Sequence, residues 1–393
     1  MVLYYKAMKK ISNFEYKQNL QKVNTKWLIT VFLLALSSCT FAIRTPAVST
    51  KQLHPKQNLF RGVFHVHTNY SHDSKASLDL VIQTAEKAGL DFVVVTDHNN
   101  MKAAAAYQKM KKPDHLLLLI GDEISTWSDG HLNSIGIKTE PPDIENTEEI
   151  INLIHKQNGY AIISHPLSRR KPWPNWKIKD FDGLEIFCFS DVFYAQNPMK
   201  LLLKATFLTP RSLLKSELKN QEAGLKLWDE KLMSGRHIAA FGAADAHLKF
   251  KWHNFYVENY LLYFQAVTMY VLADEFKEEK ITEALGHGRS FVAFEVYGLA
   301  QDFSFSASAE NKNYGPGDSI VTKMPVLLTI KAPKESNIRL IYNGNVIQQN
   351  QGKTIEYKVS EPGYYRTEVY TEGKLWIVSN PIYLEVSPNP SAS

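Results

Sequence analysis

The stretch FVVVTDH at residues 92–98 joins four apolar residues, three of them valines, to an aspartate and a histidine at its end. A short apolar run of this kind is typical of a strand buried on both faces. Just before it, GVFHVH at residues 62–67 predicts another strand, whose two histidines at i and i+2 point to one face. Further strands are predicted at residues 116–120, 161–163, 184–189 and 238–241, with helical spacing between them. This alternation predicts an α/β fold with a parallel sheet, and the length favours a closed or distorted barrel.

Histidines and carboxylates mark the ends of these strands, where α/β barrels carry their active sites. The groups are His65, His67, Asp97, His98, Glu123, His165, Asp245 and His247. One histidine on an apolar strand is usually a satisfied core residue, but two i, i+2 pairs with further groups at strand ends are not explained that way. Imidazoles and carboxylates that converge at one edge are ligands for zinc, manganese or iron. The sequence therefore predicts a metal centre at that edge.

Six short motifs resemble, in order, those of the PHP (polymerase and histidinol phosphatase) domain. They read HVHT (65–68), SHD (71–73), TDHN (96–99), GDE (121–123), SHP (164–166) and ADAH (244–247). The resemblance covers about residues 60–297. The stretch GHLNSIG at residues 130–136 is similar to the branch of carbaryl-hydrolase-like metal hydrolases. The resemblance implies a distorted (β/α)7 barrel and metal-dependent hydrolysis.

Carried over position by position, the resemblance implies a centre of two to three divalent ions (Zn, Mn or Fe). The nine implied ligands are His65, His67, Asp73, His98, Glu123, His131, His165, Asp245 and His247. One ion would take His65, His67, Glu123 and Asp245; a second would share Glu123 and add His131 and His165; a third would take Asp73, His98 and His247. The family's usual Ser-Asp-Gly is SHDS here (71–74), so either His72 or Asp73 is the ligand.

The implied catalytic residues are Glu123, Asp245 and His247. Asp97 is expected to orient His98 or a neighbouring ligand from outside the coordination sphere. Nitrogen and oxygen donors without a thiolate suit hydrolysis, with a metal-bridging hydroxide as the expected nucleophile. The sequence has no Gly-x-Ser-x-Gly elbow and no phosphate-cradling glycine-rich loop, which argues against serine hydrolases and nucleoside triphosphatases.

The leading hypothesis is a metal-dependent hydrolase acting on a small-molecule phosphoester. One alternative is hydrolysis of a carbamate, ester or amide at the same metal site, which the motif around His131 suggests. Another is a non-enzymatic cell-surface binding protein whose metal site is structural. Arg169 to Lys171 either hold a phosphate or form a solvated loop, and Arg289 is expected to be an ordinary surface residue.

The N-terminal region reads as a targeting segment. Residues 1–38 contain six lysines and one glutamate, so they carry the whole net charge of +5 and leave the remainder neutral, which argues against a nucleic-acid partner. The apolar run WLITVFLLAL (27–36) followed by SSC (37–39) resembles a bacterial lipobox. We expect a signal peptide over 1–38, a lipid on Cys39, a tether over 39–58 and a periplasmic or cell-surface lipoprotein anchored to a membrane. The alternatives are a signal cleaved after Ala42 and a plain N-terminal anchor.

The predicted secondary structure changes near residue 298. Residues 59–298 form the predicted hydrolase domain, and from 299 to 388 the helical spacing gives way to six or seven short strands. These strands predict a small immunoglobulin-like sandwich as an accessory domain, with Asn343-Gly344 as a hairpin turn. Cys188, within an apolar strand, is expected to be a buried, inert thiol without a disulfide partner.

Overall fold

The computed structural model describes residues 58–385, except for residues 196, 198–199, 201–203, 205–206, 219–220, 250, 253–254 and 257–259. The predicted signal peptide, Cys39 and nearly all of the tether lie outside the described residues. Among the helices that are described, none is both long and apolar enough to cross a membrane.

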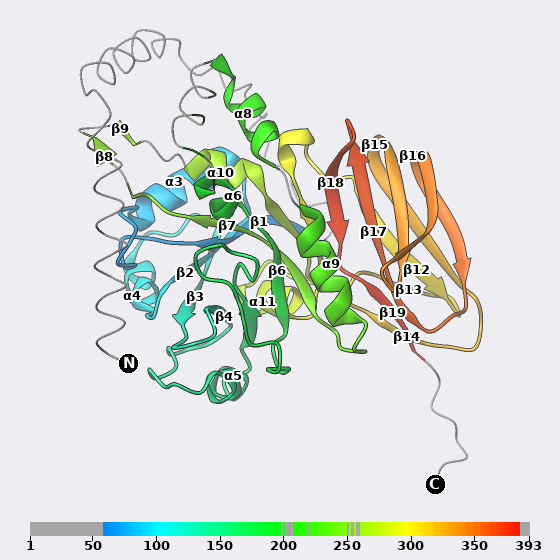
Figure 1. The fold of residues 1–393 in the computed structure, drawn as a ribbon, viewed down its shortest axis with the longest axis horizontal. Coiled ribbons are helices and arrows are strands. Elements are labelled where there is room, and N and C mark those ends of the chain that lie inside the picture. Colours follow the sequence, from blue (N-terminus) through cyan, green and yellow to red (C-terminus); the bar gives the residue numbers. More distant parts are fainter. Residues whose placement is uncertain are drawn as a thin grey trace. The chain divides into compact units, whose positions relative to one another are not determined.

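Seven strands close a barrel (Figure 1). They are β1 (Leu59–Val66), β2 (Phe92–His98), β3 (Leu117–Ser125), β4 (His131–Ile135), β5 (Tyr160–Ile163), β6 (Gly183–Cys188) and β7 (Ala239–Ala246). Each strand pairs with the next, and β7 pairs with β1. The predicted α/β barrel is therefore confirmed.

The prediction of a purely parallel sheet is wrong at β4. This strand runs antiparallel to both of its neighbours, β3 and β5. Its sequence, HLNSI, has a polar residue at three of its five positions, so it lacks the continuous apolar run by which the other strands were predicted. The polar positions serve the site, since His131 and Asn133 both contact other site residues.

Helices in the connections cover the barrel strands. They are α3 (Leu78–Ala88), α4 (Lys102–Lys109), α5 (Thr147–His155), α6 (Phe189–Tyr194), α8 (Pro210–Glu217), α9 (Gln221–Leu232), α10 (Tyr260–Ala266) and α11 (Glu278–Gly286). Helix α3 begins where Ser77 accepts a hydrogen bond from the backbone of Leu80 and ends at Gly89, whose φ of 67° suits glycine. The apolar faces of these helices and the strands share one core.

Two further strands extend the sheet from the barrel. Strand β10 (Thr268–Leu272) runs antiparallel to the first half of β1, and β11 (Ser290–Ala293) pairs with β10. A 3-10 turn, η1 (Glu295–Tyr297), follows, and a separate short hairpin is formed by β8 (Lys251–Trp252) and β9 (Phe255–Tyr256).

The C-terminal region consists of strands, yellow to red in Figure 1, which confirms its predicted all-β character. They are β12 (Ser304–Ala309), β13 (Lys312–Tyr314), β14 (Ser319–Val321), β15 (Val326–Tyr342), β16 (Asn345–Val359), β17 (Gly363–Thr371), β18 (Lys374–Ser379) and β19 (Ile382–Glu385). The first part of β15 pairs with β12 and the last part with β17, and its register with β16 shifts between Lys331 and Ser336. The predicted Asn343-Gly344 turn joins β15 and β16, with φ of 47° and 79°. The immunoglobulin-like arrangement stays a prediction.

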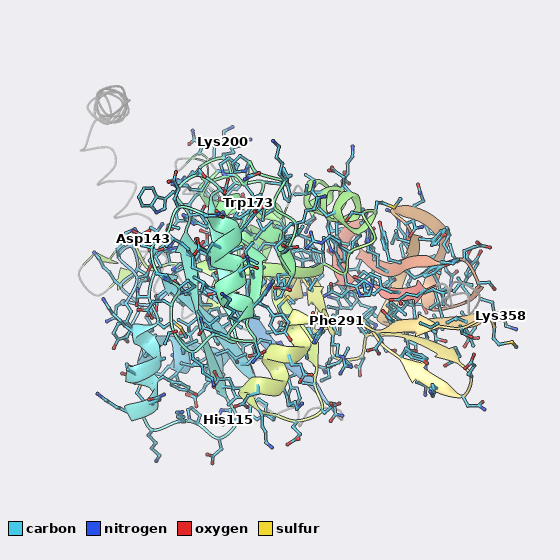
Figure 2. All side chains as sticks on the ribbon, turned by 90° about the horizontal axis from the view of Figure 1, so that it is seen from below. His115, Asp143, Trp173, Lys200, Phe291 and Lys358 are labelled. Carbon is cyan, nitrogen blue, oxygen red and sulfur yellow. The ribbon has the colours of Figure 1, made fainter. Side chains whose placement is uncertain are left out.

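One hydrogen-bonded sheet runs from the barrel into the C-terminal region. Strand β1 pairs with β10, β10 with β11, β11 with β18, and β18 with β17. Phe291 of β11, labelled in Figure 2, lies opposite Ser379 of β18, whereas Lys358 lies on β16 among the C-terminal strands. The boundary predicted at residues 298–299 lies in the connection between η1 and β12, and the sheet links the two sides of it through the pairing of β11 with β18.

A buried ion pair also joins the barrel to these strands. Arg366 of β17 is 2% exposed and donates from Nε and Nη2 to the two carboxylate oxygens of Asp229 in α9, at 2.8 and 2.6 Å. It also donates from Nη1 to Glu368 at 2.7 Å and lies over the ring of Trp228. One guanidinium thus pairs with two carboxylates at the junction.

The Arg366→Met variant should lose about 3–5 kcal/mol of unfolding free energy, because it leaves two carboxylates without their buried partner. Denaturant unfolding of the full chain measures the loss. Arg289→Met is the control: Arg289 is half exposed and lies 3.5 Å from Asp318, so less than about 1 kcal/mol is expected. Equal losses for the two variants would contradict the role assigned to Arg366.

Candidate metal centre

Glu123, fully buried on β3, lies at the middle of the site. Its two carboxylate oxygens face different sets of imidazoles. Oε2 lies 3.2 Å from His65 Nε2, 3.2 Å from His67 Nε2 and 3.1 Å from His98 Nδ1. Oε1 lies 2.9 Å from His131 Nδ1 and 3.1 Å from His165 Nε2. A carboxylate placed in this way can bridge two ions.

Asp245 completes the first set of donors. Its Oδ1 lies 3.4 Å from His65 Nε2 and 3.3 Å from His67 Nε2. The donor atoms of these three residues and Glu123 all lie within 4.8 Å of one another, which is compact enough for one ion. A second such group joins Glu123 to His131 and His98. The resemblance implies that His98 binds the third ion only. In the structure its Nδ1 lies 3.1 Å from Glu123 Oε2, and its Nε2 lies 3.8 Å from Asp73 Oδ2.

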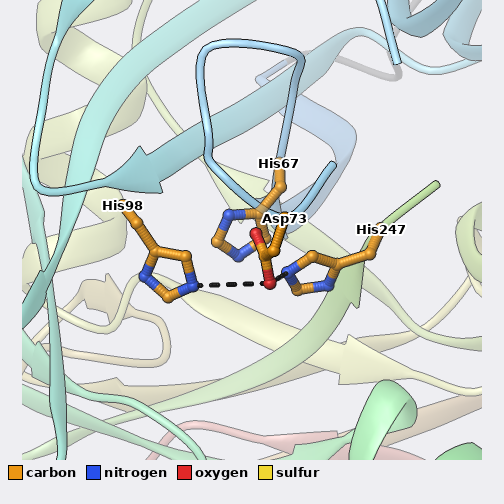
Figure 3. Close-up of side chains that lie close together, drawn as sticks. All are labelled: His67, Asp73, His98 and His247. Atoms are coloured by element: carbon orange, nitrogen blue, oxygen red, sulfur yellow. Dashed lines mark ion pairs between the residues drawn. The ribbon is translucent and has the colours of Figure 1, made fainter. Parts of the chain in front are cut away.

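The third set gathers around Asp73 (Figure 3). Asp73 Oδ2 lies 3.0 Å from His247 Nε2 and 3.8 Å from His98 Nε2, and His67 lies within the same cluster. The neighbouring His72 is exposed, although its ring centroid is 5.0 Å from that of His98. Of the two candidates that the sequence leaves open, Asp73 is thus the one that the structure brings to the cluster.

Unusual backbone geometry turns three of these residues toward the centre. His65, His165 and Asp245 have φ of 66°, 29° and 48°, a region that non-glycine residues seldom adopt. The pairing of β1 with both β2 and β7 shifts register around His65. Irregularities of this kind re-aim side chains next to active sites, at a cost in backbone energy.

Glu185 is a site residue that the sequence analysis missed. It is 2% exposed on β6, and its Oε1 accepts hydrogen bonds from His65 Nδ1 at 2.6 Å and Asn133 Nδ2 at 2.9 Å. Its Oε2 accepts from the backbone N–H of His165 at 2.6 Å. A signal was present, because Glu185 is the one charged residue in the apolar run at 184–189.

Two other residues contact the loops and ligands of the cluster without belonging to it. Asp97 accepts hydrogen bonds from both the backbone N–H and the hydroxyl of Thr68, each at 2.6 Å, and so fixes the loop after His67. Cys188 is buried as predicted, but its sulfur lies 3.6 Å from Asp245 Oδ2 and donates to it. Burial raises the pKa of this thiol well above its usual range, so Cys188 stays protonated and holds Asp245 in place.

Burial disfavours the charged form of every group in the cluster. Neighbouring groups decide which of them are charged. Burial alone would raise the pKa of Glu123, but the surrounding histidines hold it well below its usual range. Burial would lower the pKa of His67, yet its hydrogen bonds to Asp245 and Glu123 raise it to about 9. The pKa of His165 also rises to about 9, beside Glu123 and against the effect of burial. Burial and two neighbouring imidazoles lower the pKa of His98 to about 3.

Two tryptophans and four basic residues are not among the donors of the cluster. Trp173, labelled in Figure 2, is buried, and Trp127 is exposed and donates to Asp143. Arg289 lies beside Asp318, as expected of a surface residue. Arg169, Arg170 and Lys171 are exposed in the loop that follows His165.

Replacing Glu185 with glutamine should weaken metal binding by about 10–100-fold, because His65 loses the acceptor that sets its orientation. Competition with a chromophoric chelator measures the affinity. Glu356→Gln, at an exposed glutamate on β16, is the control and should leave the affinity unchanged. An unchanged affinity in Glu185→Gln would show that His65 is oriented without it.

Comparisons with known proteins agree with the motifs. Residues 64–201 match the model of the PHP domain. An uncharacterised protein of Methanocaldococcus jannaschii is 30% identical over 135 residues, which are 31% of this chain and 78% of that protein. The match to the PHP-domain model supports the prediction of a hydrolase.

Solved structures give more distant likenesses. A two-domain protein from Bacteroides vulgatus, containing a predicted PHP-like metal-dependent phosphoesterase, is 14% identical with a TM-score of 0.42, over 82% of this chain and 95% of that one. PsfC from Pseudomonas syringae is 10% identical with a TM-score of 0.39, over 61% and 92% of the two chains. On the sequence matches to the domain model and to the archaeal protein, the chain belongs to the PHP-domain family.

Proposed function

We propose that the protein is an exported metal-dependent hydrolase that acts on a small-molecule phosphoester and is anchored to a membrane by a lipid on Cys39. The observation that carries the proposed activity is the position of Glu123, whose two oxygens each face a separate set of imidazoles. A pair of ions that shares one carboxylate is typical of sites that activate water against phosphorus or carbonyl centres.

The residues present fit two to three divalent ions, such as Zn, Mn or Fe. The donors are imidazoles and carboxylates, and three groups of them are compact enough to hold an ion each. On the assignment that the resemblance implies, His65, His67, Glu123 and Asp245 would hold one ion, His131 and His165 with Glu123 a second, and Asp73, His98 and His247 a third. The compact second group has His98 with Glu123 and His131, and the compact third group also contains His67. Bound ions supply a water whose pKa falls from about 15.7 toward roughly 7 and neutralise charge that develops on the ester.

The protein's own part is to orient these donors and to limit water around them. Glu185 accepts from His65 Nδ1, which leaves Nε2 directed at Glu123 and Asp245. Both oxygens of Asp245 are engaged, one toward the histidines and one by the Cys188 thiol. A low pKa keeps the His98 imidazole neutral at pH 7, the form that binds a metal.

The cluster has an edge that substrate can reach. The side chains of Asp73 and His131 are 25% and 14% exposed, whereas those of His65, His67 and Glu123 are fully buried. Structural metal sites are normally closed by four protein ligands. This partly open edge favours an enzyme over the binding-protein alternative.

Elemental analysis and a substrate panel test the proposal together. The full chain is purified without chelator and assayed with p-nitrophenyl phosphate, bis-p-nitrophenyl phosphate and a naphthyl carbamate. We expect two to three bound ions per chain and turnover of at least one phosphoester. Turnover of the carbamate alone would favour the carbaryl-hydrolase-like alternative, and bound metal without any turnover would favour a binding protein.

The proposed anchor has its own test. Mass spectrometry of the N-terminal peptide from the exported protein should show a lipid on Cys39 and the absence of residues 1–38. A free N-terminus after Ala42, or an intact residue 1, would contradict lipidation.

A further inference from the structure

One lysine lies directly beside the candidate metal centre. Lys249 follows His247 by two residues, and its Nζ lies 3.4 Å from Asp73 Oδ2. The same oxygen lies 3.0 Å from His247 Nε2. Lys249 therefore places a positive charge at the partly open edge of the cluster, where the side chain of Asp73 is 25% exposed.

A second cation approaches the same place from another loop. Lys249 Nζ lies 5.0 Å from the centroid of the Tyr194 ring, and Arg170 Cζ lies 4.9 Å from that centroid. Tyr194 ends α6, Arg170 belongs to the loop after His165, and Lys249 follows β7. The end of one helix and two loops thus bring two cations onto one aromatic ring, a favourable contact in itself.

In the metal-loaded protein, the ion pair with Asp73 no longer explains why a positive charge is placed at this position. A carboxylate that binds a dication gives up most of its negative charge to that ion. Lys249 then stands next to a second positive charge, and like charges close together near a protein surface repel each other. An anion at the open edge would relieve this repulsion.

The charge of the substrate decides how much such a lysine contributes. A phosphomonoester carries about −1.5 to −2 at pH 7 because its second pKa is near 6, whereas a phosphodiester carries one charge. Arg289, another basic residue of the chain, lies beside Asp318 instead. The extra charge of a monoester would therefore meet Lys249 first and Arg170 behind it.

We propose that Lys249, supported by Tyr194 and Arg170, forms an anion subsite that selects phosphomonoesters over phosphodiesters. This inference rests on the proposed phosphoesterase function and names its substrate class. The subsite binds the non-bridging oxygens of the phosphoryl group that point away from the ions. It is a specificity-determining site, and it takes no part in activating water.

Kinetics of the full chain with two related substrates test the selection. The variants are Lys249→Met, Lys249→Arg, which keeps the charge, and Lys75→Met, which removes an exposed lysine two residues from Asp73. We expect Lys249→Met to raise KM for p-nitrophenyl phosphate by about tenfold, equivalent to roughly 1.4 kcal/mol, and to change KM for bis-p-nitrophenyl phosphate less than about twofold. Lys249→Arg should restore most of the loss, Arg170→Met should show a smaller one, and Lys75→Met should behave as wild type. An equal change with both esters would overturn the proposal.

Binding of inorganic phosphate tests the subsite without turnover. Isothermal titration of the metal-loaded chain should show weaker phosphate binding in Lys249→Met by about the same factor, with unchanged metal content by elemental analysis. If no phosphoester is hydrolysed by the wild type, the proposed function fails, while this loss of phosphate affinity would still support the subsite. Equal phosphate affinities, or a fall in metal content that accompanies the loss, would overturn it.

Discussion

Glu123→Ala should lose hydrolytic activity by on the order of 10³-fold, the upper range for removing one group that stabilises charge in a transition state. The reason is geometric: Glu123 is the carboxylate within 3.2 Å of imidazoles from two different sets. Its loss removes a donor from two ions at once and leaves the buried histidines without their counter-charge. Steady-state kinetics with p-nitrophenyl phosphate and elemental analysis of the purified variant measure the two effects.

Asp73→Ala is the matched comparison, because Asp73 is a carboxylate of the same cluster that faces the third set alone. We expect a smaller loss, about 10–100-fold, and the absence of at most one ion per chain. Glu123→Ala should lack two. Equal losses, or a greater loss at Asp73, would refute the bridging role of Glu123.

Removing the metals with a strong chelator should abolish hydrolysis and lower the melting temperature. A ligand present at about 1,000 times its Kd stabilises the folded state by about 4 kcal/mol, so two to three ions make a large contribution. Part of this binding free energy offsets the backbone strain at His65, His165 and Asp245, whose positive φ values are costly. Calorimetry before and after chelation measures the shift, and readdition of Zn, Mn or Fe identifies the ion that restores activity. Full activity in chelated protein would contradict the proposed function.

Metal binding by the chelated protein should depend on pH. His67 and His165 have pKa values raised from 6.5 to about 9, so both are protonated at pH 7 without metal. An ion binds the neutral imidazole, so its uptake releases protons and its apparent affinity rises with pH up to about 9. In the chelated protein, folding stability changes with pH in the opposite direction to metal affinity. Stability that these raised pKa values contribute is full below about pH 6.5 and is lost as pH rises through about 9. Calorimetric titration in buffers of different ionisation enthalpy counts the released protons.

Much of the centre was predictable because its ligands sit at fixed places in the strand pattern. Phe92 to His98 is one strand, and its last residue is a member of the cluster, as its sequence indicated. The i, i+2 spacing brought the Nε2 atoms of His65 and His67 within 3.1 Å of each other. The motif SHD (71–73) added Asp73, and the stretch GHLNSIG (130–136) added His131; spacing alone would not have identified either residue.

What the sequence did not reveal depends on contacts between distant segments. Glu185 was hidden within an apolar strand, and its role follows from its meeting with His65, 120 residues earlier. Strand β4 lacked an apolar run because its polar side chains face the site. Lys249 belongs to none of the motifs. It lies beside Asp73 because β7 and β1 are neighbours in the closed barrel. The spacing of apolar residues describes one helix or strand at a time, so it predicts none of these contacts between distant segments.

The sheet that runs from β1 through β10 and β11 to β18 also constrains how the chain reaches its folded state. Its pairings join residues near 60 to residues near 270, and residues near 292 to residues near 378. Contacts so far apart in sequence slow folding, because the loops between them must close first. A chain emerging from the ribosome therefore holds β11 with an unpaired edge until β18 has been synthesised, and such edges recruit other strands. The edge of β11 thus stays open to pairing with other chains during synthesis, and the pairing with β18 closes it.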